Sequence, residues 1–239
     1  MSLNKNPTAR GAGQHTGSAV TLRILSALLG YPDAALRSHL PEMADLLEQE
    51  RALGGKRSCE LLALIASLEH TDPLESEAAY VELFDRGRAT SLHLFEHVHG
   101  DSRDRGPAMI NLGQTYETAG LVLAEGELPD YLPAVLEFVS TQPAAEAKAF
   151  LGEIAHLLKG IFGALRKRDS AYASVLGALL ELAGEKAEAV DPAPEPPLDE
   201  SWAEPVVFDG CSTQGQARPG QPQPMHIVRK ASYTQGALS

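Results

Sequence analysis

The chain has 239 residues, only 5% aromatic residues and a formal net charge of −12. A chain of this length can bury a substantial core, and its few aromatic residues favour helices over sheets. The negative charge disfavours nucleic acid and anionic membrane surfaces as partners, because both would repel it. We therefore expect no nucleic-acid binding and no stable membrane association.

Residues 1–16 form a polar segment that contains basic but no acidic residues. This composition predicts a disordered N-terminal arm, and the arm lacks the unbroken apolar run of a secretory signal. No stretch of the sequence approaches the roughly 18 apolar residues of a membrane-spanning helix. The two cysteines, Cys59 and Cys211, fit a reducing compartment. These features together predict a cytoplasmic protein.

Residues 17–190 carry apolar side chains in steps of three and four, which is the spacing of helices. The clearest series are Leu36, Leu40, Met43 and Leu47; Leu61, Leu62, Ile65 and Leu68; Leu151, Ile154, Leu158, Ile161 and Leu165; and Tyr172, Val175, Leu176, Leu179 and Ala183. Asp72 precedes Pro73 as a helix cap, and Asp130 is placed to cap the helix that has Pro133 in its first turn. We predict an all-α protein with a single compact domain of about 7–9 helices.

Residues 83–106, LFDRGRATSLHLFEHVHGDSRDRG, hold three histidines, four arginines and four acidic residues. On a helix, His93 and His97 would share one face at a spacing that suits zinc. However, Glu96 directly precedes the second histidine, so the metalloprotease pattern H-E-x-x-H is absent. A third ligand would have to come from His99, Asp101 or Asp104. We predict no metal site here.

Two other interpretations of this stretch are catalytic and purely structural. The sequence has no G-x-S-x-G elbow and no phosphate-binding loop, so an enzyme is not expected. As a helix–loop–helix junction, the stretch would pair Asp85 with Arg86 or Arg88, and Asp101 or Asp104 with Arg103 or Arg105. Exposed ion pairs contribute little stability, so a purely structural role explains only part of this concentration of charged residues. We favour recognition of a peptide that has both apolar and charged side chains.

Residues 128–138 form a second candidate stretch for recognition. One face of the helix carries Tyr131, Val135 and Phe138, and the adjacent face is also apolar. A helix that is apolar over so much of its surface is either buried or offered to a partner. Tyr116 and Tyr131 suit the wall of a groove, because a tyrosine can pack its ring and still form a hydrogen bond.

Residues 191–239 form a tail that is acidic and rich in proline, a composition that predicts an extended and disordered segment. Within it, residues 201–211 (SWAEPVVFDGC) contain the only tryptophan, Trp202, and a short apolar group. We interpret 201–211 as a short adhesive segment.

The segment YVELFDRGRATSLHLFEHVHGDSRDRGPAMINLGQTYETAGL, followed by ELPDYLPAVLEFVS, closely resembles the respiratory nitrate reductase assembly chaperones. This family, also called the nitrate reductase delta subunit, belongs to the all-helical redox-enzyme maturation proteins. The similarity extends over roughly residues 20–210 and includes WAEPVVF. The N-terminal arm and the Gln/Pro-rich end have no counterpart in it.

The resemblance implies a chaperone that has no catalytic activity and no cofactor of its own. Its partner would be the N-terminal segment of the nitrate reductase catalytic (alpha) subunit, within the apo alpha–beta complex. The chaperone would hold that subunit competent for molybdenum cofactor insertion before membrane docking. Molybdenum cofactor biosynthesis proteins are further candidate partners.

We predict that nine residues from the two motifs and their surroundings contact the client peptide. They are Tyr80, Phe84, Arg86, His93, Phe95, His97, Tyr116, Tyr131 and Phe138. The alternative is a general helical adaptor or scaffold that binds another amphipathic peptide, and a metal-dependent enzyme comes third.

Overall fold

The structure is a computed structural model that describes residues 12–100, 102–124 and 126–188. The tail and its segment 201–211 lie outside these residues, so their predicted properties stay predictions. The described residues are largely helical and contain no strand, apart from a single antiparallel bridge between His93 and Tyr131. The all-α prediction is confirmed.

The α-helices are α1 (Ala12–Leu28), α2 (Ala34–Glu50), α3 (Gly55–His70), α4 (Pro73–Tyr80), α5 (Leu94–Val98), α6 (Arg105–Thr118), α7 (Leu132–Ser140), α8 (Ala144–Glu153), α9 (Ala155–Lys167) and α10 (Ala173–Ala183). A π-helix, Val81–Asp85, continues α4, and Arg88–Thr90 form a 3-10 turn. The described residues thus hold ten α-helices, more than the seven to nine expected. One reason is that the apolar series 151–165 breaks at Ile154, between α8 and α9.

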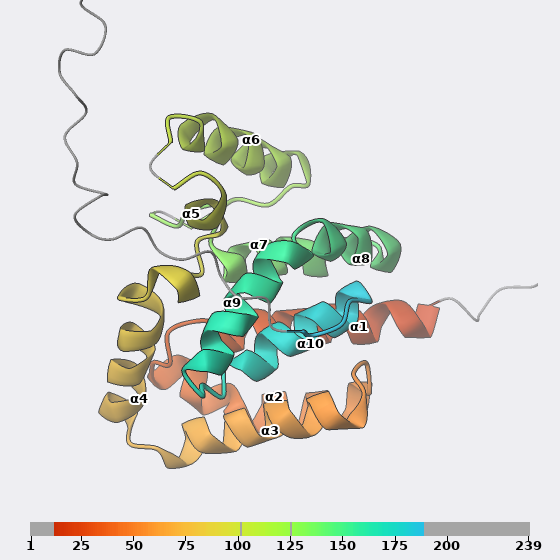
Figure 1. Ribbon diagram of the computed structural model, residues 1–239. Coiled ribbons are helices and arrows are strands. Elements are labelled where there is room, and N and C mark those ends of the chain that lie inside the picture. Colours follow the sequence, from red (N-terminus) through yellow and green to blue (C-terminus); the bar gives the residue numbers. More distant parts are fainter. Residues whose placement is uncertain (1–11, 101, 125, 189–239) are drawn as a thin grey trace, which may run out of the picture. The chain divides into compact units, whose positions relative to one another are not determined.

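Helix α10 lies at the centre of the core, against α9, α8, α3 and α1 (Figure 1). It can do so because its side chains are apolar on nearly every face, and Val175, Leu176 and Leu179 are fully buried. Burying a leucine or valine completely stabilises a fold by roughly 1.5–3 kcal/mol. Helix α1 forms the second layer and packs against α7 and α2.

The helix caps agree only in part with the sequence predictions. Asp72 caps α4 as predicted: its side chain accepts hydrogen bonds from the backbone N–H groups of Leu74 and Glu75, and Pro73 is the first helical residue. The prediction that Asp130 caps α7 is wrong. The N-cap of α7 is Tyr131, which makes no side-chain cap, and the Asp130 carboxylate turns instead toward α5.

Helix α6 lies beside α5, away from α1–α3 (Figure 1). It is attached to the core through Tyr116, which is almost fully buried and donates a hydrogen bond of 2.8 Å to the carbonyl of Pro129. The Tyr116 ring also packs against Phe138 of α7, with 4.9 Å between ring centroids. Among the described helices, none is both long and apolar enough to cross a membrane.

The chain turns sharply after the π-helix, at Gly87. A Cβ atom here would lie 2.8 Å from the Leu83 carbonyl oxygen and would also meet the Thr90 hydroxyl. Only glycine fits so close an approach of backbone to backbone. The turn places Phe84 and Arg88 beside the start of α5, where the candidate site lies.

Candidate peptide-binding site

The two stretches singled out in the sequence, 83–106 and 128–138, lie side by side. The backbone N–H of Leu94 donates to the Asp130 carbonyl at 3.0 Å, and the N–H of Leu132 donates to the Leu92 carbonyl at 2.8 Å. The bridge between His93 and Tyr131 lies between these two bonds. The start of α5 is therefore tied to the start of α7, and both contribute to one surface.

Asp130 holds this junction together from inside. Its side chain is fully buried, and the carboxylate accepts the backbone N–H of Phe95 at 3.1 Å. The other carboxylate oxygen, Oδ1, lies 3.3 Å from Nδ1 of His93. The guanidinium of Arg105, on α6, lies 3.9 Å from Oδ2, the oxygen that accepts the Phe95 N–H. The hydrogen bond to Asp130 raises the pKa of His93, against the opposing effect of partial burial. One buried carboxylate thus connects α5, α6 and α7.

An apolar cavity of about 450 Å³ opens beside the junction, and we call it the apolar cavity. Its lining residues are Tyr31, Tyr80, Phe84, Asp85, Leu92, His93, Gly126, Glu127, Leu128 and Tyr131. Tyr31 and Leu128 expose 45% and 43% of their surface. A smaller hollow of about 380 Å³ shares Tyr31 and adds Leu74, which is 75% exposed. Exposed apolar side chains gathered on one surface are typical of interaction sites.

The wall of the apolar cavity is aromatic and fixed by hydrogen bonds. The Tyr80 hydroxyl donates to the Leu29 carbonyl at 2.7 Å, so the Tyr131 hydroxyl, 3.3 Å from it, is the donor of the second bond. The Tyr80 ring packs against Phe84 and Tyr31 at centroid distances of 4.8 and 5.6 Å. Burial raises the pKa of both Tyr80 and Tyr131, so these phenols stay neutral at physiological pH. The wall therefore offers rigid aromatic faces to a partner.

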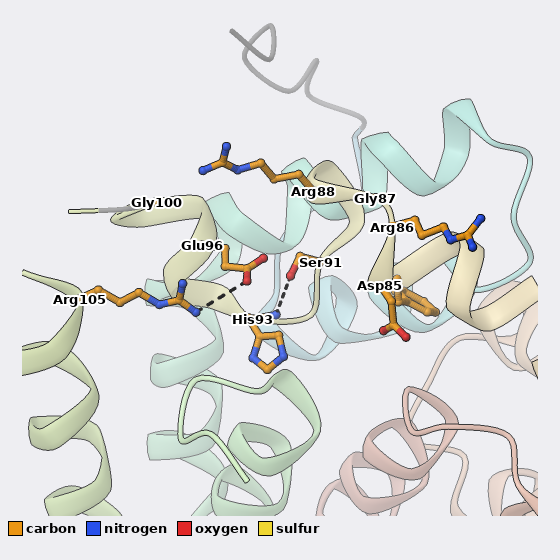
Figure 2. Close-up of a pocket in the computed structure, with 10 residues that line it drawn as sticks. Asp85, Arg86, Gly87, Arg88, Ser91, His93, Glu96, Gly100 and Arg105 are labelled. Atoms are coloured by element: carbon orange, nitrogen blue, oxygen red, sulfur yellow. Dashed lines mark hydrogen bonds and ion pairs between the residues drawn. The ribbon is translucent and has the colours of Figure 1, made fainter. Parts of the chain in front are cut away.

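A second cavity of about 490 Å³ adjoins the first, and we call it the polar cavity (Figure 2). It is lined by Phe84, Asp85, Arg86, Gly87, Arg88, Ser91, His93, Glu96, Gly100 and Arg105. The two cavities share Phe84, Asp85 and His93. A partner that fills the apolar cavity therefore also lies next to the strongly charged polar cavity.

The structure brings five of the nine predicted contact residues to the cavities. Tyr80, Phe84, His93 and Tyr131 line the apolar cavity, and Arg86 lines the polar one. Arg86 is exposed and forms an ion pair of 2.9 Å with Glu82.

The other four predicted residues line neither cavity. Phe95 and His97 lie on α5, where the His97 ring is 2.9 Å from the Ser91 carbonyl and Phe95 packs against His99. Tyr116 and Phe138 are buried against each other between α6 and α7. Their assignment as peptide contacts stays a prediction.

Arg86 and Arg105 of the dense stretch have partners other than the local ones considered in the sequence. Arg105 faces Glu96 at 3.7 Å as well as Asp130, and Arg86 pairs within the π-helix. Among residues 12–100, 102–124 and 126–188, no three His, Cys, Asp or Glu side chains gather into a group that could hold a metal ion. Asp101, one candidate ligand, lies outside the described residues.

Sequence analysis missed the cavity residues Tyr31 and Glu127 and the central role of Asp130, and it included Leu128 in the second stretch without naming it as a contact residue. Tyr31 follows the first helix in a Gly-Tyr-Pro turn, and no local pattern links it to Leu128, nearly a hundred positions later. The available signal was an isolated aromatic or leucine in an otherwise polar turn. Such side chains need a neighbour to cover them, but the sequence does not say which.

The helical architecture is similar to that of a known class of proteins. A crystal structure from Archaeoglobus fulgidus, of a protein assigned as a redox enzyme maturation protein, superimposes with a TM-score of 0.52 over 76% of this chain and 100% of that chain. The sequences are 19% identical, so this similarity concerns the fold. The chain therefore has the fold of that helical class.

The sequence comparisons are more specific. The family model described as nitrate reductase delta subunit matches residues 32–177, and the chain belongs to this family. It is 44% identical to the nitrate reductase molybdenum cofactor assembly chaperone NarJ of Escherichia coli K12, over 79% of this chain and 84% of that protein. A Bacillus subtilis 168 protein assigned the same role is 32% identical, over 69% of this chain and 89% of its own length.

Proposed function

We propose that this protein is a chaperone dedicated to nitrate reductase assembly and has no catalytic activity of its own. It binds the N-terminal segment of the apo catalytic (alpha) subunit in the cytoplasm. It keeps that subunit competent for molybdenum cofactor insertion until the enzyme docks at the membrane. Family membership and the roles of the relatives support this assembly function. The choice of the N-terminal segment rests on the resemblance to the assembly chaperones, and the apolar cavity supports a client that has apolar anchors.

The apolar cavity is the observation that carries the proposal. It combines aromatic walls with two half-exposed apolar side chains at its mouth, Tyr31 and Leu128. A pocket of this kind fits an apolar anchor from an amphipathic client helix. The carboxylates of Asp85 and Glu127 also line it, and the whole chain has a net charge of −12. A client with basic residues beside its apolar anchors therefore has the complementary charge, which also speeds encounter.

The size of the apolar cavity suits a transient complex. At about 450 Å³ it admits a few side chains rather than a whole domain. Each large apolar side chain buried there contributes roughly 1.5–3 kcal/mol before the costs of association are subtracted. Such a site can bind one client selectively and still release it when assembly is complete.

Calorimetric titration with a peptide copying the N-terminus of the organism's own alpha subunit tests the proposal. We expect saturable one-to-one binding to the full chain. Leu128→Ala should weaken it about tenfold, which corresponds to roughly 1.4 kcal/mol of lost apolar contact. The matched control is Ile110→Ala, which truncates another exposed apolar side chain, on α6 and outside both cavities.

Two results would contradict the proposal. If the folded protein bound no alpha-subunit peptide, the general adaptor would become the better interpretation. If Leu128→Ala and Ile110→Ala weakened binding equally, the client would not lie in the apolar cavity.

A further inference from the structure

Helix α4 and the π-helix that continues it have two apolar faces, and only one of them is buried. The inner face places Tyr80 and Phe84 in the core. The outer face carries Leu74, Ala78 and Val81, which are four and three residues apart and therefore lie along one side of the helix. Leu74 is 75% exposed. A helix on the surface of a globular protein needs only one apolar face, so the second face indicates a partner.

The three outer side chains line the smaller hollow of about 380 Å³, which we call the α4 hollow. Its other lining residues are Tyr31, Glu77, Glu82 and Arg86. The charged groups among them are already bonded within the lining: Arg86 forms its 2.9 Å ion pair with Glu82, and Glu77 accepts a hydrogen bond of 3.0 Å from the Tyr31 hydroxyl. The α4 hollow therefore suits an apolar side chain of a ligand better than a charged one.

Tyr31 connects the α4 hollow to the apolar cavity, because it lines both. Its ring packs edge-on against Tyr80, with 5.6 Å between ring centroids, and its hydroxyl is held by Glu77. The side chain is thus positioned by contacts of both its ring and its hydroxyl, although it is 45% exposed. A ligand that fills the apolar cavity and continues past Tyr31 meets the α4 hollow next.

The two sites are close enough to be filled from one helix. Ala78 lines the α4 hollow, and Phe84, six positions later (84 − 78), lines the apolar cavity. At the roughly 1.5 Å rise per residue of a helix, these positions are about 9 Å apart. In a client helix, two apolar side chains about seven residues apart lie on one face at a distance of about 10.5 Å along the axis. One client helix can therefore place an anchor in each site.

We propose that the α4 hollow is a second anchor site for the client helix, and that it takes an apolar side chain two turns away from the one in the apolar cavity. This inference rests on the proposed function and adds the spacing that the client must have. Continuity with the apolar cavity favours the client over a second copy of this chain. A stable interface between two proteins uses about 20–30 residues on each side, far more than line the α4 hollow.

Titration of the full-length protein with the alpha-subunit peptide tests the second site. Leu74→Ala should weaken binding about tenfold, through the loss of one large apolar contact. Ala78→Gln, which fills the hollow with a polar side chain, should weaken it by at least as much. The matched controls, Ile110→Ala and Ala79→Gln, change exposed side chains outside the α4 hollow and both cavities, and they should bind as the unaltered chain does. Circular dichroism verifies that each variant is folded.

Alanine variants of the peptide measure the spacing of the two anchors. Each apolar peptide residue is replaced in turn, and every peptide is titrated against the unaltered chain, Leu128→Ala and Leu74→Ala. The peptide residue that contacts Leu74 should lose most of its effect in Leu74→Ala but keep it in Leu128→Ala, and the first anchor should show the reverse. We expect two different peptide residues, about seven positions apart.

The second site would be overturned if Leu74→Ala bound the peptide as tightly as the control variants do, or if one and the same peptide residue were coupled to both Leu74 and Leu128. Binding that still depended on Leu128 would then leave the proposed function standing. A dimer that Leu74→Ala dissociates, with unchanged peptide affinity, would assign the hollow to a second copy and also overturn the inference. A peptide that does not bind the unaltered chain would overturn both proposals.

Discussion

Replacing Asp130 tests how the two recognition stretches are joined. Asp130→Ala removes a fully buried carboxylate that accepts the Phe95 N–H, bonds to His93 and faces Arg105. Without the carboxylate, the Phe95 N–H loses its acceptor, and His93 and Arg105, although partly exposed, lose a fully buried partner. We therefore expect a loss of stability much larger than that of an ordinary helix cap.

The magnitude follows from the contacts. Loss of the cap on α5 costs about 1 kcal/mol, and loss of the hydrogen bond between the carboxylate and His93 costs roughly 1.5–3 kcal/mol. The Arg105 pair is long and partly exposed, so it adds little. The total is about 3 kcal/mol, at the lower end of the range for breaking a buried ion pair. Asp130→Asn keeps an acceptor for Phe95 and should lose about half as much.

Urea unfolding at neutral pH, followed by circular dichroism, measures these losses. The matched control is Asp72→Ala, which removes an exposed aspartate that only caps α4, at an expected cost of about 1 kcal/mol. Should Asp130→Ala cost no more than Asp72→Ala, the inference that Asp130 ties α5 to α7 would be refuted.

Two further predictions concern the same region. The raised pKa of His93 means that its bond to Asp130 stabilises the fold fully below the ordinary histidine value, near pH 6.5, and this contribution is lost as the pH rises through the raised value. The difference in unfolding free energy between the unaltered chain and His93→Gln should therefore be larger at about pH 6 than at about pH 9. A difference that stays constant with pH would contradict the stabilising role of the bond between His93 and Asp130. Gly87→Ala should destabilise the fold by about 1–3 kcal/mol, because the new methyl group meets the Leu83 carbonyl. Gly113→Ala, in open space on α6, should stabilise it by about 0.5–1 kcal/mol. Thermal unfolding of both glycine variants checks this, and equal shifts would contradict it.

The helices were predictable because their signals are local. The apolar series of α2, α3 and α10 recur at helical spacing, and the Asp72 cap precedes a proline. The break at Ile154 was not predictable in this way, because Leu151, Ile154 and Leu158 keep the helical spacing across it. Periodicity reports which face is buried, and a change of helix direction leaves that pattern unaltered.

The candidate site was predictable only in outline. The two stretches that carry it stand out in sequence, but Asp130 has its partners on α5 and α6, at positions that no local pattern identifies. Local capping rules assigned it to α7, the helix that follows it directly. Tyr116 and Phe138 show the reverse problem: a tyrosine suited to a groove wall is equally suited to a buried contact with the Pro129 carbonyl.

Site-specific photocross-linking from position 128 to the full apo alpha subunit tests the central claim most directly. A photoreactive phenylalanine analogue at Leu128, at the mouth of the apolar cavity, should give cross-links that mass spectrometry maps to the N-terminal segment of the alpha subunit. The same analogue at Ile110 should give none there. Cross-links from position 128 to other parts of the alpha subunit, or equal N-terminal cross-links from both positions, would contradict the account.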